Sequence, residues 1–244
     1  REHRYNLWFV VTAASRAHLD EVVAGIERDT GCPVIVLPLE EEFHIDLGFD
    51  LKAGAQGRRA HGATSSGEPI ALANGDEGCK LPAVERQLIT ALQGGLVLEP
   101  RPFERLAATV GLDEAAVIAR IEGWLDDGLI RRFGVVVRHH ELGLEANAMC
   151  VWDVPDDQVS ALGRQLAREA AVTLCYRRSR VQPDWPYNLF CMIHGSAREE
   201  VLAAREALAA RLGLDRHPHA VLFSCKRFKQ TGARYLGAKD LANV

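Results

Sequence analysis

The chain has 244 residues, 48% of them hydrophobic and 25% charged, with a formal net charge of -4. This composition excludes a disordered chain and indicates one or two packed domains, and the acidic balance gives no general attraction to nucleic acid or anionic lipid. No hydrophobic run approaches the roughly 18 residues of a membrane span, and six cysteines without CxxC spacing indicate free thiols, so we expect a cytoplasmic protein without membrane contact.

Residues 1–47 contain two strand-like runs around one helix. The runs Tyr5–Thr12 and Val34–Leu39 are rich in hydrophobic and β-branched residues, which is typical of strands. Between them a helical hydrophobic spacing is formed by Leu19, Val22, Val23 and Ile26. Residues 48–80 are dominated by Gly, Ala, Ser, Asn and charge without any period, and we predict a linker of low order there.

Residues 81–145 predict three short helices and a hairpin, the pattern of a winged helix-turn-helix domain. The first two helices are marked by Val84, Leu88, Ala91, Leu92 and Phe103–Ala108. Asp113 is a good N-cap for the third helix, which we expect to end at Asp127–Gly128. The run Leu129–Val137 then alternates loosely, which indicates a strand of the wing.

Residues 146–244 predict a second domain in which strands and helices alternate. The predicted elements are Ala148–Val154, Asp156–Glu169, Val172–Val181, Tyr187–Ile193, Ala197–Leu212 and Ala220–Phe228. Their order, βαββαβ, is that of the ferredoxin-like fold. The predicted fold class is therefore α+β, a winged helix-turn-helix plus a ferredoxin-like domain.

The first block of the sequence repeats the end of the last one. Arg4–Val11 matches Pro186–Ile193 through a shared Tyr-Asn-Leu, and after a helix Val34–Phe43 matches Ala220–Phe228. Residues 1–47 therefore predict the second half of another βαββαβ unit, a tandem copy whose first copy is truncated. Half a unit leaves strand edges unpaired, so we expect the missing half upstream in the same gene or on a partner chain.

Several motifs resemble the siroheme decarboxylase family, and the architecture resembles the Lrp/AsnC regulators. The motifs are Phe133–Gly143, Ala146–Met149 with Val151–Pro155, Cys175–Arg178, Trp185–Phe190 and Phe228–Gly232. The resemblance implies a fused two-subunit carboxy-lyase that removes two acetate carboxyls from siroheme, giving didecarboxysiroheme for haem d1 or, by a related route, haem. Siroheme is then the substrate, no separate cofactor is expected, and we also expect a homo-oligomer.

A substrate with many carboxylates requires cations of planar, bidentate geometry. The candidates are Arg177, Arg178 and Arg180 on one predicted strand, together with Arg138. Alternation places Arg178 and Arg180 on one face and Arg177 on the other, so only a bulge lets all three line one wall. A solvated strand edge is the alternative interpretation of this run.

Aromatic residues beside these cations favour a pocket for a flat macrocycle. Tyr176, Trp185 and Tyr187 provide them, and Tyr176 with Arg177 is a candidate catalytic pair. Positions equivalent by the repeat add candidates from the first block, although His44 could equally end a solvated strand. The further candidate substrate-binding residues are Asn188, Lys229, His3, Arg4 and His44.

Two adjacent histidines are the candidate proton donors. Loss of carbon dioxide from a pyrrole-attached acetate leaves electron density that the macrocycle can spread, and the resulting methylene must be protonated. His139 and His140 suit this role near neutral pH, and since strand neighbours face opposite ways only one is expected to serve. The alternatives for either are an ordinary hydrogen bond or axial ligation of the siroheme iron. The protein has no predicted metal site of its own.

The helical segment has too little positive charge for a DNA reader. Residues 84–133 contain six Arg and eight acids, a balance of -2, and the third helix starts with Asp113-Glu114. Acids at the end that would enter the major groove repel phosphates. We therefore expect no DNA binding, and the alternative hypotheses are a ligand-responsive Lrp/AsnC-like regulator and a haem carrier without turnover.

Overall fold

The computed structural model describes residues 2–13, 15–45, 81–130, 133 and 146–229. The chain divides into two compact units, one made of Arg1–Phe9, Pro33–Pro69 and Val136–Phe228, and the other of the remaining residues. We call the first the α/β unit. The predicted linker, residues 48–80, lies outside the described residues, as does most of the predicted wing. Within those residues no helix has the length and hydrophobicity that a bilayer span requires.

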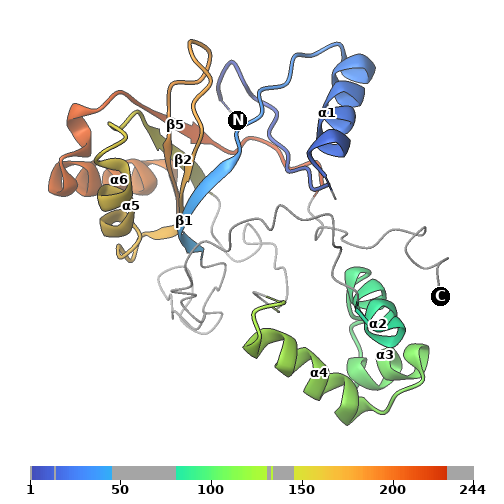
Figure 1. Ribbon diagram of the computed structural model, residues 1–244. Helices are drawn as coiled ribbons and strands as arrows, with labels where there is room; N and C mark the ends of the chain where they lie inside the picture. The colour runs from blue at the N-terminus through green and yellow to red at the C-terminus, as the bar shows by residue number, and fades with distance from the viewer. Residues whose placement is uncertain (1, 14, 46–80, 131–132, 134–145, 230–244) are drawn as a thin grey trace. The chain divides into compact units, whose positions relative to one another are not determined.

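A five-stranded antiparallel sheet forms the α/β unit, in the order β1-β3-β4-β2-β5 (Figure 1). The strands are β1 Leu39–Ile45, β2 Ala146–Trp152, β3 Val172–Arg178, β4 Leu189–Gly195 and β5 His219–Phe223. The last four strands and the helices α5 (Val159–Leu166) and α6 (Arg198–Leu212) follow the order βαββαβ. This confirms the predicted ferredoxin-like α+β domain.

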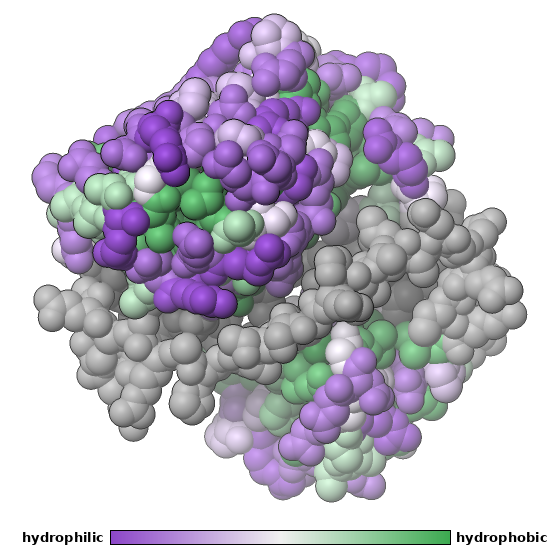
Figure 2. Space-filling model, turned by 60° about the vertical axis from the view of Figure 1, so that its left-hand side comes forward, coloured by the Kyte–Doolittle hydropathy of each residue, from purple (hydrophilic) through white to green (hydrophobic). Residues whose placement is uncertain are grey.

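Helices α5 and α6 lie together on one face of the sheet (Figure 1). Three buried cysteines, Cys150, Cys191 and Cys175, are neighbours across β2, β4 and β3 beneath these helices. Burial raises the pKa of the Cys175 and Cys191 thiols, so both stay neutral and act as small hydrophobic residues. The outer surface of the unit, as seen in Figure 2, is mainly hydrophilic with a small hydrophobic patch.

The prediction of two strands in the first block is wrong. Tyr5–Thr12 contains no strand, and Val34–Leu39 reaches one only at its last residue, where β1 begins. Strand β1 then adds to the edge of β3, with Glu41 opposite Arg177 and Ile45 opposite Leu174. The reason is that a strand needs a neighbour for its backbone hydrogen bonds, and in the described part of the chain only the acidic segment finds one.

Strand β1 is fixed to helix α5 by one aromatic side chain and one acid. Phe43 packs against Gly163 of α5 so closely that a Cβ on that glycine would lie 2.2 Å from Phe43 Cε2. Glu41 accepts hydrogen bonds from Ser160 at 2.5 Å and from Arg164 at 3.1 Å. The first block is therefore docked on the second domain through specific contacts.

The repeat between the first and last blocks extends to helix length and to the C-terminal helix cap. Helix α1 (Arg16–Thr30) and α6 each have 15 residues and end at a glycine with positive φ, 66° at Gly31 and 68° at Gly213. Yet α6 buries Val201 and Leu208, whereas α1 buries none of its residues. The helix therefore forms as predicted, but its hydrophobic stripe has no buried position in the described structure.

The helix-turn-helix segment forms as the sequence predicts. Its helices are α2 (Ala83–Gln93), α3 (Pro102–Val110) and α4 (Glu114–Asp126). The Asp113 carboxylate caps α4 by accepting a hydrogen bond from the Ala116 amide at 2.7 Å. A separate small core holds the helices together, with Leu88, Leu106, Val117, Ile121 and Trp124 buried in it.

Substituting Gly163→Ala tests the docking of β1. The new methyl group collides with Phe43, and overpacking of this kind costs about 1–3 kcal/mol of folding free energy. The same change should be neutral or stabilising in a Phe43→Ala background, because Ala is the better helix former. Denaturant unfolding of the four proteins gives the coupling energy.

Gly123→Ala in α4 is the matched control, since no described atom lies within 4 Å of the added Cβ. It should be neutral or slightly stabilising in either background. An equal cost of Gly163→Ala with and without the Phe43 ring would show that β1 does not dock on α5.

Candidate functional site

An aromatic cluster lies on the face of the sheet opposite α5 and α6. We call this face, on which the described part of the domain places no helix, the open face. Alternate residues of β2 separate the two faces, with Cys150 under the helices and Met149 in the open-face cluster. At the centre Trp185 is 1% exposed and its ring lies 5.3 Å from His3, 5.5 Å from Trp8 and 5.3 Å from Tyr187. All three are edge-on contacts, each worth about 0.5–1.5 kcal/mol beyond burial.

The indole Nε1 of Trp185 is buried and has no hydrogen-bond partner among the described residues. Buried indole N–H groups normally find an acceptor. Within the described residues, the Trp185 indole is therefore an exception to this rule.

Tyr176 and Arg178 form one wall of this open face. The Tyr176 ring stacks on Phe190 at 5.5 Å, and the guanidinium carbon of Arg178 lies 4.7 Å from the Tyr176 ring centroid. Arg178 Nη1 donates a 2.7 Å hydrogen bond to the carbonyl oxygen of Leu37. The sequence predicts a pocket in which aromatic faces lie beside cations, and the structure places these two side chains in contact, whereas the pocket itself stays a prediction.

The other two predicted arginines form ion pairs with carboxylates. Arg180 Nε lies 2.9 Å from Asp153 and its Nη1 lies 2.8 Å from Asp156. Arg177 pairs with Glu40 at 2.7 Å and with the same Asp156 at 3.1 Å. Arg180 and Arg177 thus bind the same carboxylate, and Arg180 does not lie on the same strand face as Arg178. The reason is that Arg180 lies beyond the end of β3, where strand alternation no longer applies.

These ion pairs fix the charge states of the cluster. The hydrogen bond from Arg180 holds the pKa of Asp156 below its usual range. Burial alone lowers the pKa of Arg180, but its hydrogen bonds with Asp156 and Asp153 outweigh burial and raise that pKa. Sequence reasoning missed these acids, although Asp153 and Asp156 flank Pro155 directly after the hydrophobic run of β2.

Asn188 is buried and hydrogen bonds to the chain itself. Its Oδ1 accepts from the Val154 amide at 3.0 Å, and its Nδ2 donates to the Val154 carbonyl oxygen at 2.9 Å. A third bond, at 3.3 Å, runs from Nδ2 to Asp156. The amide therefore holds the end of β2 and the acid of the ion-pair cluster in place.

The candidates from the first block differ in their surroundings. His3 contacts Trp185, its repeat equivalent, and burial, followed by the charge of Arg4, lowers its pKa. Arg4 is exposed and pairs with Asp184 at 3.1 Å. His44 lies on β1 opposite Cys175. Only His3 and Arg4 therefore lie beside the aromatic cluster, and the repeat identified both.

The remaining candidates are not placed in this site. Arg138, His139 and His140 lie outside the described residues, so their roles stay predictions. Lys229 is exposed and belongs to the second compact unit.

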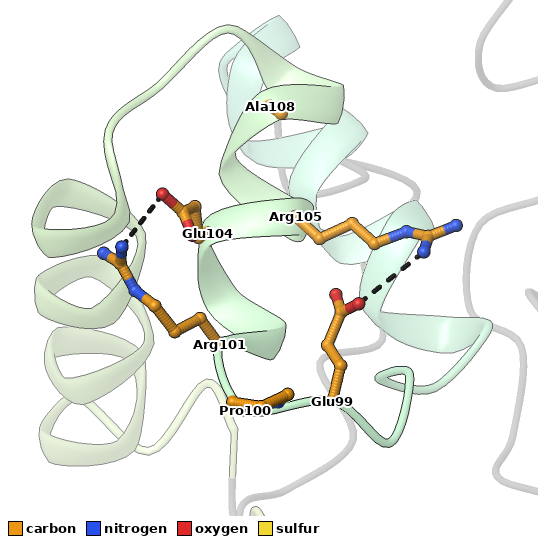
Figure 3. A pocket seen from close by; sticks show the side chains of 6 residues that line it. All are labelled: Glu99, Pro100, Arg101, Glu104, Arg105 and Ala108. Carbon is orange, nitrogen blue, oxygen red and sulfur yellow. Dashed lines mark ion pairs between the residues drawn. The ribbon is translucent and has the colours of Figure 1, made fainter.

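A shallow hollow lies beside α3 in the helix-turn-helix segment (Figure 3). Its volume is about 460 Å³, and it is lined by Glu99, Pro100, Arg101, Glu104, Arg105 and Ala108. Arg101 pairs with Glu104 at 3.0 Å and with Glu114 at 2.5 Å, and Arg105 lies 3.7 Å from Glu99. Since each arginine has a carboxylate partner, the hollow offers little positive charge to a phosphate.

Comparison with known proteins identifies both domains. The profile of the siroheme decarboxylase NirDL-like HTH domain matches residues 85–131, and that of the AsnC-like ligand binding domain matches residues 141–229. Together with the ferredoxin-like sheet, these matches define a protein of the Lrp/AsnC-like class.

Two related proteins show to which family within this class the chain belongs. The chain is 40% identical to the siroheme decarboxylase NirDL subunit of Paracoccus denitrificans over 233 residues, 96% of this chain and 68% of the relative. It is 50% identical to the siroheme decarboxylase NirL subunit of Stutzerimonas stutzeri over 149 residues, 61% of this chain and 88% of that one. The chain belongs to the siroheme decarboxylase family.

A solved structure of a siroheme decarboxylase NirDL is also similar, with 30% identity and a TM-score of 0.45. The match covers 66% of this chain and 49% of the solved one. The chain thus spans about two thirds of the Paracoccus denitrificans relative and about half of the solved chain.

Arg180→Lys tests whether this guanidinium holds the ion-pair cluster together. Lysine has one nitrogen and cannot bond to Asp153 and Asp156 in the same geometry, so we expect a loss of about 1–2 kcal/mol of folding free energy. Arg211→Lys, at a single exposed pair with Glu169, is the control and should change it by less than about 0.5 kcal/mol. Equal effects in chemical denaturation would refute a special role for Arg180.

Proposed function

We propose that this chain is the larger part of a siroheme decarboxylase, which removes two acetate carboxyls from siroheme without oxidation. The product is didecarboxysiroheme, used for haem d1 or, by a related route, for haem. The observation that carries this proposal is the 40% identity to a siroheme decarboxylase subunit across 96% of the chain. The aromatic side chains beside Arg178 support it, because aromatic faces next to a cation suit a flat conjugated ligand that carries carboxylates.

Arg178 is the arginine best placed to hold a substrate carboxylate. In the described part of the chain, Arg177 and Arg180 pair with acids, whereas the bonded partner of Arg178 is a neutral backbone carbonyl. A guanidinium bound only to a neutral acceptor keeps its charge uncompensated and still offers donors. The hydroxyl of Tyr176 donates a 3.7 Å hydrogen bond to the Met149 sulfur, a weak acceptor.

The reaction requires a held carboxylate, a dry surface and a proton. The electron pair of the breaking carbon–carbon bond enters the macrocycle as carbon dioxide leaves, so the substrate itself is the electron sink and no separate cofactor is proposed. Proton transfer to the remaining methylene carbon gives a methyl group. We propose one of His139 and His140 as the acid, and the other remains a candidate for the siroheme iron.

The first half of the enzyme is proposed to complete the AsnC-type domain that residues 2–45 begin. Support comes from helix α1, which buries none of its residues although its counterpart α6 buries several. Relatives named as NirL and NirH subunits of siroheme decarboxylases are consistent with such pairing. The missing half is then an upstream segment or a partner subunit, and association of two such assemblies would give the expected homo-oligomer.

The cytoplasm is the proposed compartment. The five cysteines that the structure describes are free, which supports a reducing environment. DNA is not a proposed partner, since α4 carries Glu114 in its first turn and its cap is Asp113.

Anaerobic incubation of the assembled protein with siroheme should give a product lighter by two carboxyl groups, followed by mass spectrometry. His139→Ala and His140→Ala are made separately, and the variant that lacks the acid should turn over about 10²–10⁴-fold more slowly. His18→Ala, on α1, is the matched control and should keep the full rate. Unchanged substrate mass with the unmodified protein would refute the activity.

Titration of a fluorescent DNA duplex should show dissociation constants weaker than about 10⁻⁴ M at physiological salt. Acids on α4 are the proposed cause, so the double variant Glu114→Lys, Glu122→Lys should bind more tightly and with a steeper salt dependence. Submicromolar binding of a specific promoter fragment by the unmodified protein would instead favour the regulator.

A further inference from the structure

Strand β1 is the acidic end of the first block, and a second segment of the chain is its counterpart. With Pro33 aligned on Pro218, Leu39–His44 corresponds to Ser224–Lys229, and Phe43 corresponds to Phe228. The segment from Ser224 to Lys229 lies in no strand, and from Cys225 onward it is exposed. The first-block segment Leu39–His44 is thus docked on a sheet edge, whereas its counterpart Ser224–Lys229 is exposed to solvent from Cys225 onward.

One contact at the aromatic cluster joins equivalent positions of the two copies. His3 and Trp185 are equivalent in the repeat, and their rings lie 5.3 Å apart. In a two-fold arrangement equivalent residues meet near the axis, and every contact occurs twice with the roles exchanged. Such an arrangement of two complete domains would give the docking of the first-copy tail on the second-copy edge a reciprocal.

We infer that the segment Ser224–Phe228 adds as an edge strand to the first copy of the AsnC-type domain, on the strand that corresponds to β3. The inference rests on the proposed partnership with a first half and specifies how the two halves are joined. Phe228, 73% exposed, then takes the place of Phe43 and packs against the α5-equivalent helix of that domain. Backbone hydrogen bonds provide affinity in such strand addition, and side-chain pockets provide specificity.

The two tails have opposite charge. The docked tail carries Glu40, Glu41 and Glu42, and its receiving edge carries Arg177 together with Arg164 of α5. The exposed tail is of opposite sign, with Lys226, Arg227 and Lys229. The inference therefore predicts carboxylates on the receiving edge of the first half.

A second copy of this chain does not offer such an edge. Its β3 is already paired with β1, and Arg177 and Arg178 on that strand would repel a basic tail. Addition of the basic tail to the first half is therefore favoured over its addition to a second copy of this chain.

Hydrogen–deuterium exchange on the assembled protein, with its first half present, tests the inference directly. Backbone amides of an antiparallel edge strand bond alternately to the neighbour and to solvent, so about half of the amides from Ser224 to Lys229 should be protected. Protection should be lost on Phe228→Ala and on Lys226→Glu, with about tenfold weaker association of the two halves when they are separate subunits.

Matched controls are Leu98→Ala for the exposed hydrophobic residue and Arg168→Glu for the exposed cation, and both should leave exchange unchanged. Amides of Ser224–Lys229 that exchange at unprotected rates in an assembly that decarboxylates siroheme would refute strand exchange and leave the proposed function intact. Protected amides in an assembly without turnover would support strand exchange and refute the activity. Failure of the halves to assemble at all would refute both the partnership and the exchange.

Discussion

The requirement that every strand pair its backbone governs this structure. Residues 2–45 carry sequences suited to several strands, yet in the described chain only Leu39–Ile45 forms one, because β3 offers it an edge. The docking depends on Phe43 fitting over a glycine of α5 and on Glu41 bonded across to the same helix. The hydrophobic segments upstream lie instead on the open face, where Tyr5 and Trp8 join the aromatic cluster.

The distribution of carboxylates decides which cations are available for chemistry. Asp153, Asp156 and Glu40 compensate Arg177 and Arg180. Strong, multiply bonded guanidinium groups of this kind build structure, whereas Arg178 remains paired with a neutral carbonyl over the Tyr176 ring. A run of arginines that looks uniform in sequence thus divides into two that are paired with carboxylates and one that is bound to a backbone carbonyl.

The two halves of the repeat also differ in the charge of their tails. An acidic tail covers the basic edge of the second copy, and a basic tail is left exposed at the end of that copy. Related sheets joined by tails of opposite charge would form a pair that differs from either self-pair.

The sequence by itself determined the element types of the second domain, the Asp113 cap, the repeat and the family, because hydrophobic periodicity, capping chemistry and long motifs are local properties. Helix α1 was likewise predictable, since its spacing and terminal glycine need no partner. Only the tertiary structure decided that Tyr5–Thr12 is not a strand, that Leu39–Ile45 is one, and that Arg180 joins Arg177 on Asp156. These outcomes depend on which edge and which carboxylate lie within reach, and distances across the fold are not encoded in any single segment.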